Sequence, residues 1–599
     1  MIRSTGLRRI HGSVNELCSR RGCHSEGESG MKSPAQPDTG ARSFVDTLNA
    51  LGVDHLFLNP GIDVVPIQGA IATYKAQERK TPRVILCPHE SVVTAAAHGY
   101  AMVSGKPQVV TVFQDVGTLQ AGGAIPNLKY GRIPVIMCAG RNPTPNRMNW
   151  LQEPCDQRKI MRDYVKWDHE VARNEDISSV LREAFRIASR EPQGPVYLSI
   201  PRDLLTATNG EQDVTGPDAS SIPPGIDTGT LLSVADTLLA SESPLIMTAY
   251  AGRHPQSVGL LVELAEMLAA RVITTDLRMN FPSTHPLCPG IDATKGSSYD
   301  HYIPEADVLL LVDYDFPGPR AKQAAPRPDA KIIHIDIEPL KNGKPLWNRT
   351  PDVLIEGDSS SILPALTAII RQRIPATPEA RVSDRFARLA NEHDKVKNEW
   401  RMKARDERSK RPISTEWLCH KLNDALDDDA ILVHMAPSNA DALAHQIRRT
   451  KPGTLYSWGD SAGSMGWPLG AALGAKLAAP EKMVIALIGD GGFIYGCPVA
   501  TLWSASVHHA PFLSIICNNQ SYVSIRELIR AGYGESSVSG EMGFEVGTDF
   551  RDLPDFAAIA RACRAHGQTV SDPADLPAAL KNAIDQVRNG TSAVVDVIL

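Results

Sequence analysis

The stretch GDGGFIYGCPVATLWSASVHHAPFLSIICNNQSYVSI, Gly489 to Ile525, sets the fold of the C-terminal part of this 599-residue chain. The apolar run just before it, Met483 to Ile488, is typical of a central strand in a parallel sheet. Pro498 to His508 has the pattern of a crossover helix, and Pro511 to Cys517 forms the next apolar strand. A right-handed crossover brings both strand ends to one edge of the sheet, where open α/β sheets bind ligands.

Asp490 and Asn519 follow these two strands, so we expect their side chains to converge. A carboxylate, an amide oxygen and a nearby backbone carbonyl form an all-oxygen ligand set that suits Mg²⁺. The glycines Gly491 and Gly492 allow backbone N–H groups to approach phosphate oxygens. The pattern therefore predicts a metal-bridged diphosphate; the alternative is a plain strand–turn–helix with a polar end.

Composition indicates an ordinary globular protein, with 42% hydrophobic and 22% charged residues. The net charge of -6 gives no sign of a nucleic-acid partner, and no apolar run approaches the roughly 18 residues of a membrane span. The ten cysteines include no C-x-x-C pair, which argues against a zinc site or a disulfide scaffold. We therefore predict an intracellular protein, cytoplasmic or mitochondrial. The arginine-rich N-terminus suits either a mitochondrial presequence or a disordered tail.

Strand and helix patterns alternate through three long regions, which predicts an α/β fold of three doubly wound parallel-sheet domains. The expected organisation is a leader or tail (1–40), an N-terminal domain (41–206), a central domain (225–371), a charged linker (372–412) and a C-terminal domain (413–599). The charged linker reads as a solvated helix between domains.

The GDG and NN motifs resemble the signature of thiamine-diphosphate enzymes, in the family of acetolactate synthase, benzoylformate decarboxylase and pyruvate decarboxylase. The likeness runs from Ala41 to the end, although two residues more than usual separate the two motifs. The resemblance implies a pyrimidine-binding N-terminal domain, a Rossmann-like central domain and a diphosphate-binding C-terminal domain. It implies Mg²⁺ ligands at Asp490, Asn519 and the Ser521 carbonyl, and it places near the cofactor Ser438, Asn439, Gly491, Gly492 and Tyr522.

Two further segments are similar to the family's other cofactor contacts. CPHESVVTAAAHGYAMVSGKP implies that Glu90 bonds the aminopyrimidine ring and assists removal of the C2 proton. By itself, Glu90 would read as an acid in the first turn of a helix. WGDSAGSMGWPLGAALGAKLA implies that Met465 wedges between the two cofactor rings and that the Gly463 carbonyl accepts from the 4′-amino group.

The resemblance implies an enzyme that removes CO₂ from a 2-oxo acid, as a homodimer or homotetramer whose sites are shared between subunits. Ile525 and Gln114 offer no acidic proton, which favours an acetolactate synthase-like carboligase over a simple decarboxylase. In that reading Gln114 donates a hydrogen bond to the acceptor, while His89 or Tyr522 could still deliver a proton. VDYDFPGPR lacks the Arg-Phe-Asp-Asp-Arg stretch of flavin-binding acetolactate synthases, which argues against FAD.

Two readings from other classes stay open. One is a non-catalytic cofactor-binding subunit, against which the intact Glu90, Asp490 and Asn519 speak. The other is a nicotinamide dehydrogenase, which lacks the expected G-x-G-x-x-G in the central region. The pair His508–His509, late in the crossover helix, is expected to face solvent.

Overall fold

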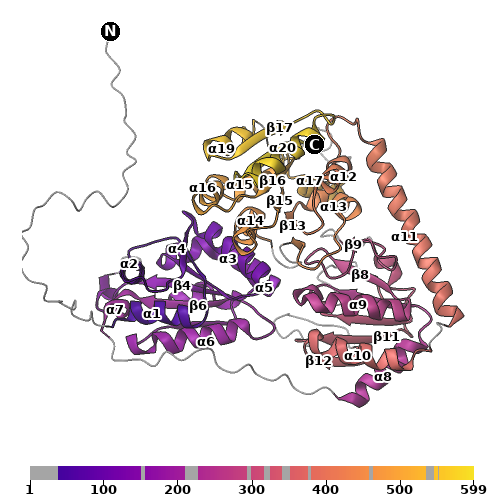
Figure 1. Ribbon diagram of the computed structural model, residues 1–599, viewed down its shortest axis with the longest axis horizontal. Coiled ribbons are helices and arrows are strands. Elements are labelled where there is room, and N and C mark those ends of the chain that lie inside the picture. Colours follow the sequence, from indigo (N-terminus) through magenta and orange to yellow (C-terminus); the bar gives the residue numbers. More distant parts are fainter. Residues whose placement is uncertain are drawn as a thin grey trace, which may run out of the picture.

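The computed structural model describes residues 38–149, 156–208, 227–292, 299–315, 324–339, 351–375, 379–457, 463–534, 545–550 and 552–599. Three six-stranded sheets lie in these residues, and the strands within each sheet pair in parallel. Helices cover the sheets, so the predicted α/β class with three parallel-sheet domains is confirmed (Figure 1). Among the described helices, none is both long and apolar enough to cross a membrane.

The N-terminal and C-terminal sheets share one strand order. The N-terminal order is β2-β1-β3-β4-β6-β5, and the C-terminal order is β14-β13-β15-β16-β18-β17. The N-terminal elements are α1 (Gly40–Ala50), β1 (His55–Leu58), α2 (Val65–Ala76), β2 (Arg83–Leu86), α3 (Glu90–Ser104), β3 (Gln108–Val112), α4 (Gln114–Ala121), α5 (Ile125–Gly131), β4 (Val135–Arg141), β5 (Trp167–Glu170), α6 (Ile177–Ser189), β6 (Val196–Pro201) and α7 (Arg202–Thr206). The C-terminal elements are α12 (Thr415–Ala425), β13 (Ile431–Met435), α13 (Ala440–Gln446), β14 (Leu455–Ser457), α14 (Trp467–Ala478), β15 (Val484–Gly489), α15 (Asp490–Tyr495), α16 (Pro498–His508), β16 (Leu513–Asn518), α17 (Val523–Tyr533), α19 (Phe556–Ala562), β17 (His566–Val570), α20 (Leu576–Arg588) and β18 (Ala593–Ile598).

The central sheet has a different order, β12-β11-β10-β7-β8-β9, in which the chain reverses direction across the sheet between β7 and β10. This is the order of a Rossmann-like fold. Its elements are α8 (Thr228–Ala240), β7 (Pro244–Thr248), α9 (Pro255–Leu268), β8 (Arg271–Thr275), β9 (Ile291–Asp292), β10 (Val308–Val312), β11 (Lys331–Asp336), β12 (Val353–Glu356) and α10 (Ser359–Arg373).

Helices α3 and α14 join the N-terminal and C-terminal domains. They pack along each other and share one apolar core with the facing sides of both sheets. A Cβ atom on Gly99 would lie 2.0 Å from the carbonyl oxygen of Ala471, and one on Gly474 would lie 1.8 Å from that of Ala96. Glycine at both positions therefore lets the two helix backbones touch.

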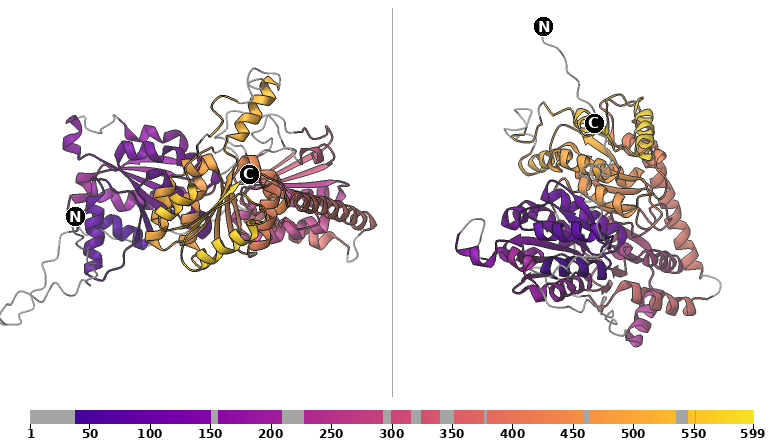
Figure 2. Two further views of the ribbon diagram at one scale, coloured as in Figure 1. Left: turned by 90° about the horizontal axis from the view of Figure 1, so that it is seen from above. Right: turned by 60° about the vertical axis from the view of Figure 1, so that its left-hand side comes forward.

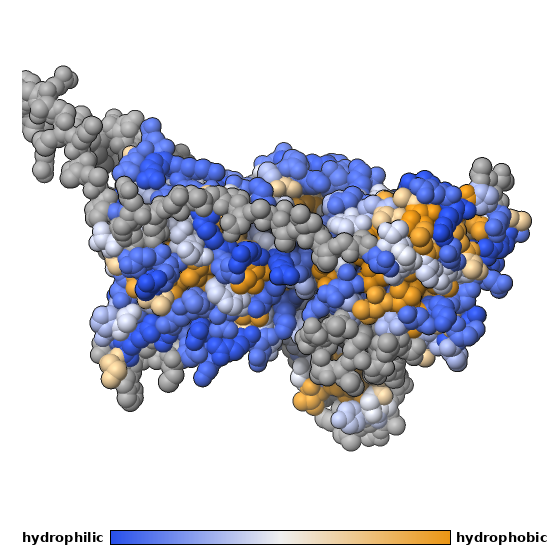
Figure 3. Space-filling view, turned by 90° about the horizontal axis from the view of Figure 1, so that it is seen from below, coloured by the Kyte–Doolittle hydropathy of each residue, from blue (hydrophilic) through white to orange (hydrophobic). Residues whose placement is uncertain are grey.

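The charged segment forms α11 (Ala380–Asp406), a helix that spans the edge of the molecule from the central to the C-terminal domain (Figures 1 and 2). Its first turns are fixed by arginines that cap neighbouring helices. Arg381 donates to Leu239 O (2.6 Å) at the end of α8, and Arg385 donates to Leu268 O (2.5 Å) at the end of α9. Figure 3 shows the molecule from below. On this face, apolar residues gather more over the central domain than over the N-terminal domain.

The stretch from Gly489 to Ile525 differs from its sequence-based prediction at two points. The glycine turn is the start of a short helix, because Asp490 to Tyr495 form α15. The prediction that the histidine pair faces solvent is wrong for His508, which is buried with its Nε2 3.0 Å from Leu86 O. Because β2 belongs to the N-terminal domain, α16 makes an interdomain contact there, and only His509 is exposed.

Candidate cofactor site

The carboxyl ends of β15 and β16 form the centre of the candidate site. These strands are parallel neighbours, with Gly489 opposite Cys517, so the residues that follow them lie at one edge of the sheet. Asp490 begins α15 directly after β15, and Asn519 to Tyr522 follow β16. The structure therefore brings Asp490 beside the loop of Asn519 and Ser521, whose backbone N–H groups approach its carboxylate.

Asp490 has one carboxylate oxygen without a partner. The residue is buried, its Oδ1 accepts from Gly491 N (2.7 Å), and its Oδ2 is enclosed without a hydrogen bond in the structure. Burial raises the pKa of Asp490, and the N–H groups of Gly491, Gln520 and Ser521 oppose that rise. A buried, half-satisfied carboxylate is costly unless a cation completes it, so the donor set fits Mg²⁺.

The loop after β16 is held in shape by residues 545–550. Ser521 Oγ donates to Thr548 O (3.0 Å), Tyr522 N donates to Thr548 O (2.8 Å), and Phe550 N donates to Gln520 O (2.8 Å). Within the loop, Ser521 N donates to Asn519 Oδ1 (3.2 Å). Sequence reasoning missed this support, because the bracing residues lie more than 20 positions away in a segment without a motif.

Asn518 and Asn519 have separate roles. Asn518 Nδ2 donates to Asp596 Oδ1 (3.0 Å) on β18, which ties the end of β16 to its neighbour. Burial raises the pKa of Asp596 to about 6. Asn519 thus starts from a fixed position at the sheet edge, and Asp596 is a support that no local sequence signal indicates.

The glycines after Asp490 leave room for close packing. A Cβ atom on Gly491 would lie 2.6 Å from Cε1 of Tyr522, and one on Gly492 would lie 2.9 Å from Cγ1 of Ile488. The Tyr522 ring also packs edge-on against Phe550, with centroids 4.5 Å apart. Gly491 therefore lies against Tyr522 directly after Asp490.

Ser438 and Asn439 lie in a 3₁₀ turn after β13, the strand next to β15. Both are thus on the same sheet edge as Asp490. The Asn439 side chain is buried, and its Oδ1 accepts from Thr415 Oγ1 (2.9 Å). The side-chain carbonyl of Asn439 therefore faces α12. Its side-chain NH₂ group and its backbone are the groups left for a ligand.

Met465 lies where the two paired domains meet. It lines a small crevice with Ser91 and Val92 of α3 and with Tyr495 of α15. The adjacent Ser464 exchanges two hydrogen bonds with Asn127 of α5, at 3.2 and 3.3 Å. A Cβ atom on Gly463 would meet open space, and the residues 458–462 of the same motif lie outside the described part of the chain.

Glu90 is the first residue of α3. The preceding His89 caps the helix, because its Nδ1 accepts from Ser91 N (3.2 Å). Glu90 is half-buried, and its Oε1 lies 3.0 Å from the place of a Cβ atom on Gly117 of α4. Among the described residues, no hydrogen bond or ion pair joins Glu90 to the Asp490 loop of the same chain.

Comparison with protein families matches all three domains. The models "Thiamine pyrophosphate enzyme, N-terminal TPP binding domain", "central domain" and "C-terminal TPP binding domain" match residues 38–160, 231–366 and 438–597. The chain belongs to the thiamine pyrophosphate enzyme family. The resemblance is thereby confirmed, and so is thiamine diphosphate as the cofactor, with Mg²⁺ as the family's usual metal.

Curated relatives align with nearly the whole length of this chain. Benzoylformate decarboxylase of Pseudomonas aeruginosa is 28% identical over 90% of this chain and 95% of its own length. Acetolactate synthase isozyme 3 large subunit of Escherichia coli is 26% identical over 93% of this chain and 94% of its own. The solved structure of 4-hydroxybenzoylformate decarboxylase from Rhodococcus jostii RHA1 has a TM-score of 0.76, at 23% identity over 94% and 99% of the two chains. That likeness shows the fold.

Gln114 begins α4, one residue after β3 of the N-terminal domain. It adopts a left-handed backbone (φ 42°), is buried, and donates from Nε2 to Asn142 Oδ1 (3.3 Å). Its backbone N donates to Asp63 Oδ2 (3.4 Å). Asp63 is fully buried, which raises its pKa to about 6, and sequence reasoning did not single it out.

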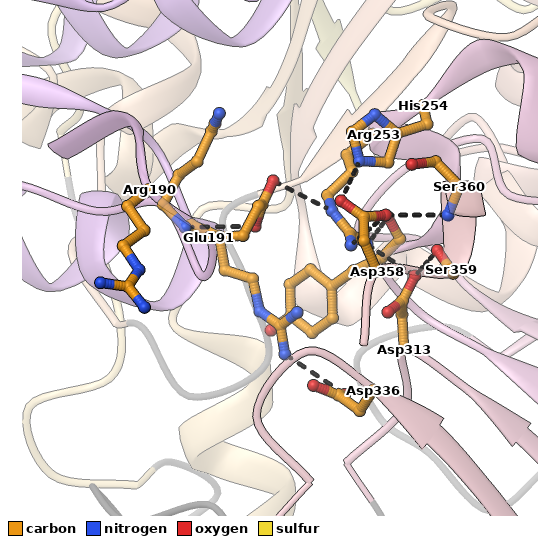
Figure 4. A network of polar contacts seen from close by, with 12 residues as sticks. Arg190, Glu191, Arg253, His254, Asp313, Asp336, Asp358, Ser359 and Ser360 are labelled. Carbon is orange, nitrogen blue, oxygen red and sulfur yellow. Dashed lines mark hydrogen bonds and ion pairs between the residues drawn. The ribbon is translucent and has the colours of Figure 1, made fainter. Parts of the chain in front are cut away.

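The strand order of the central domain reverses between β7 and β10, which is the place where a Rossmann fold binds a dinucleotide. Asp313 follows β10 and is paired with Arg253 from the loop after β7 (Figure 4). Asp336 ends β11 and is paired with Arg132 of the N-terminal domain (3.5 Å).

Arg253 also reaches Asp358 (3.5 Å) and Glu191 of the N-terminal domain (3.3 Å), on opposite sides of its guanidinium group (Figure 4). Asp313 and Asp336 are thus paired with arginines of the chain itself.

Proposed function

We propose that the protein is a thiamine-diphosphate- and Mg²⁺-dependent carboligase that decarboxylates a 2-oxo acid and joins the product to a second carbonyl compound. The observation that carries the proposal is the buried Asp490 carboxylate, with one oxygen unpartnered, beside the Asn519–Ser521 loop. When bound, thiamine diphosphate supplies an electron sink for loss of CO₂. Asp490, Asn519 and the Ser521 carbonyl would hold the metal, and Glu90 would hold a proton at the pyrimidine ring.

The structure supports ligation because Nδ1 of His89 is occupied by the helix cap and apolar side chains flank the site. His89 Nδ1 accepts from Ser91 N (3.2 Å), and Gln114 Nε2 donates to Asn142 (3.3 Å). The Tyr522 ring packs on Gly491 and Phe550. Exposed apolar side chains flank both halves of the site: Ile62, Val116 and Leu119 in the N-terminal domain, Ile525 and Leu528 on α17. Few acidic protons can reach such surroundings, so a second carbonyl compound competes well with protonation.

The test supplies a 2-oxo acid alone and then with an aldehyde or a second 2-oxo acid, and quantifies CO₂, aldehyde and hydroxyketone. A carboligase forms hydroxyketone as the main product once the acceptor is present. Aldehyde as the sole product across a panel of acceptors would establish the alternative, a benzoylformate decarboxylase-like enzyme. No CO₂ from any 2-oxo acid would favour the non-catalytic subunit.

We also infer a homodimer or a dimer of such dimers. Glu90 and the Asp490 loop would complete each other across two chains. Val499, Trp503 and Val507 supply an apolar surface, because they are spaced by four residues on one face of α16 and are 59%, 39% and 44% exposed. Mixing inactive Glu90→Gln and Asp490→Ala chains should restore activity through hybrid sites. An active monomer in light scattering would contradict the shared site.

A further inference from the structure

The turn Pro437–Asn439 lies beside the helices that follow the two signature motifs. It comes directly after β13, and a Cβ atom on Gly492 of α15 would lie 3.0 Å from Cε of Met435, the last residue of β13. Helix α17, which follows the loop after β16, contacts the same turn. Asn439 therefore lies next to the elements that would surround a diphosphate held at Asp490.

The side chain of Asn439 is held from behind by helix α12. Thr415, the first residue of α12, donates from Oγ1 to Asn439 Oδ1 (2.9 Å). Within the described part of the chain, Nδ2 of Asn439 makes no hydrogen bond. The oxygens of an ionised diphosphate only accept hydrogen bonds, so an amide suits them when its oxygen is occupied and its NH₂ group is free. The contact with Thr415 sets Asn439 in that orientation.

A buried carboxylate fixes the first turn of α12. Glu416 follows Thr415 and is 5% exposed. Its carboxylate accepts hydrogen bonds from three side chains: His445 Nδ1 (2.9 Å), Lys403 Nζ (2.8 Å) and Gln446 Nε2 (2.8 Å). Burial opposes ionisation of Glu416, but these donors lower its pKa to about 2, so the group is charged at neutral pH.

The same cluster joins α12 to α11 and α13. The Trp400 ring of α11 stacks on His445, with centroids 4.3 Å apart, and Gln446 Nε2 also donates to Trp400 O (2.8 Å). His445 and Gln446 end α13, whereas Asn439 directly precedes it. Both ends of α13 are thus tied to the first turn of α12, which keeps the backbone of Thr415 close to Asn439.

We propose that Thr415 is a positioning residue for the cofactor: its hydroxyl group holds the Asn439 amide so that the NH₂ group donates to a diphosphate oxygen. The proposal rests on the proposed function in one respect, the placing of the diphosphate beside Asp490 and Asn439, and is independent of the fate of the substrate. Thr415 acts through Asn439, so the effects of changing the two residues depend on each other.

The first experiment measures the affinity of the full-length protein for thiamine diphosphate with Mg²⁺ by titration calorimetry. Thr415→Val removes the hydroxyl group at nearly constant shape and should weaken binding about three- to tenfold, the effect of one hydrogen bond. Thr415→Ser keeps the hydroxyl group and should bind like the wild type. Wild-type affinity in Thr415→Val would overturn the proposal.

Ser414→Ala is the matched control for a purely structural effect. Ser414 Oγ caps α12 by accepting from Trp417 N (3.1 Å), and Asn439 accepts from Thr415 instead. The control should lower the free energy of unfolding in urea without weakening cofactor binding. An affinity loss in Ser414→Ala as large as that in Thr415→Val would mean that Thr415 only stabilises the helix, and would refute the positioning role.

The second experiment is a double-mutant cycle on cofactor affinity. Asn439→Ala should weaken binding at least as much as Thr415→Val, and combining the two should cause no further loss, because the hydroxyl group then has no amide to orient. Urea unfolding of each variant establishes that it is folded. Additive losses would overturn the proposal. Because these titrations use no substrate, failure of the proposed function would show separately, as a wild type that binds the cofactor but forms no hydroxyketone.

Discussion

The N-terminal and C-terminal domains use the same strand order for different chemistry. In the C-terminal sheet the third strand, β15, leads to Asp490, whose free oxygen suits a cation. In the N-terminal sheet the third strand, β3, leads to Gln114, a neutral amide bonded to Asn142. The helix after the second strand begins with Glu90 in one domain and with Trp467 in the other. The topology fixes where ligand-facing residues stand, and single side chains decide what each half of the site does.

The first prediction removes the charge from the C-terminal half. Asp490→Ala should abolish binding of thiamine diphosphate, because the metal would lose its carboxylate ligand in a buried site. Titration calorimetry with thiamine diphosphate and Mg²⁺ measures this, with exposed Asp441→Ala on α13 as the control. Affinity near that of the control would mean that Asp490 does not hold the metal.

The second prediction changes the N-terminal half alone. Glu90→Gln should bind the cofactor but exchange its C2 proton more slowly by about 10²- to 10⁴-fold, the range of acid–base assistance. Proton-exchange NMR on the bound cofactor provides the measurement. If Glu90→Gln instead lost cofactor binding and kept the rate of C2-proton exchange, Glu90 would act as Asp490 does. The two domains would then not differ in function.

The third prediction concerns the buried acid of the N-terminal domain. The folded state raises the pKa of Asp63 from 3.8 to about 6. The protonated carboxyl therefore contributes stability that is fully present below pH 4 and is lost as the pH rises through 6. Between pH 4 and 7, the wild type should lose up to about 3 kcal/mol of unfolding free energy relative to Asp63→Asn. Urea unfolding of both proteins at the two pH values tests this; a constant difference would contradict it.

The fourth prediction tests the contact through which the two domains cooperate. Gly474→Ala should cost about 1–3 kcal/mol of unfolding free energy, because its Cβ would lie 1.8 Å from Ala96 O in the α3–α14 contact. Gly259→Ala on α9, where no atom lies within 4 Å, should be neutral or slightly stabilising. Urea unfolding compares the two. Equal changes in unfolding free energy for the two variants would show that α3 and α14 can move apart without destabilising the protein.

Local patterns predicted the elements because they depend on neighbouring residues. The apolar runs before Asp490 and Asn519 form β15 and β16, and their parallel pairing follows from one crossover. The Glu90 segment begins a helix for the same kind of reason. The solvent-facing reading of His508 failed because α16 also packs on the N-terminal domain, which its own periodicity cannot reveal.

The sequence by itself determined the three parallel-sheet domains, the family and the placing of Asp490 and Asn519 at adjacent strand ends, since strand order and crossover handedness follow from short-range patterns. Only the tertiary structure decided that Thr548 braces the loop after β16, and that Arg253 and Arg132 pair with acids at the strand ends of the central sheet. Those contacts join residues far apart in the chain. They arise from how domains pack, and side-chain packing between distant segments leaves no periodic signal in the sequence.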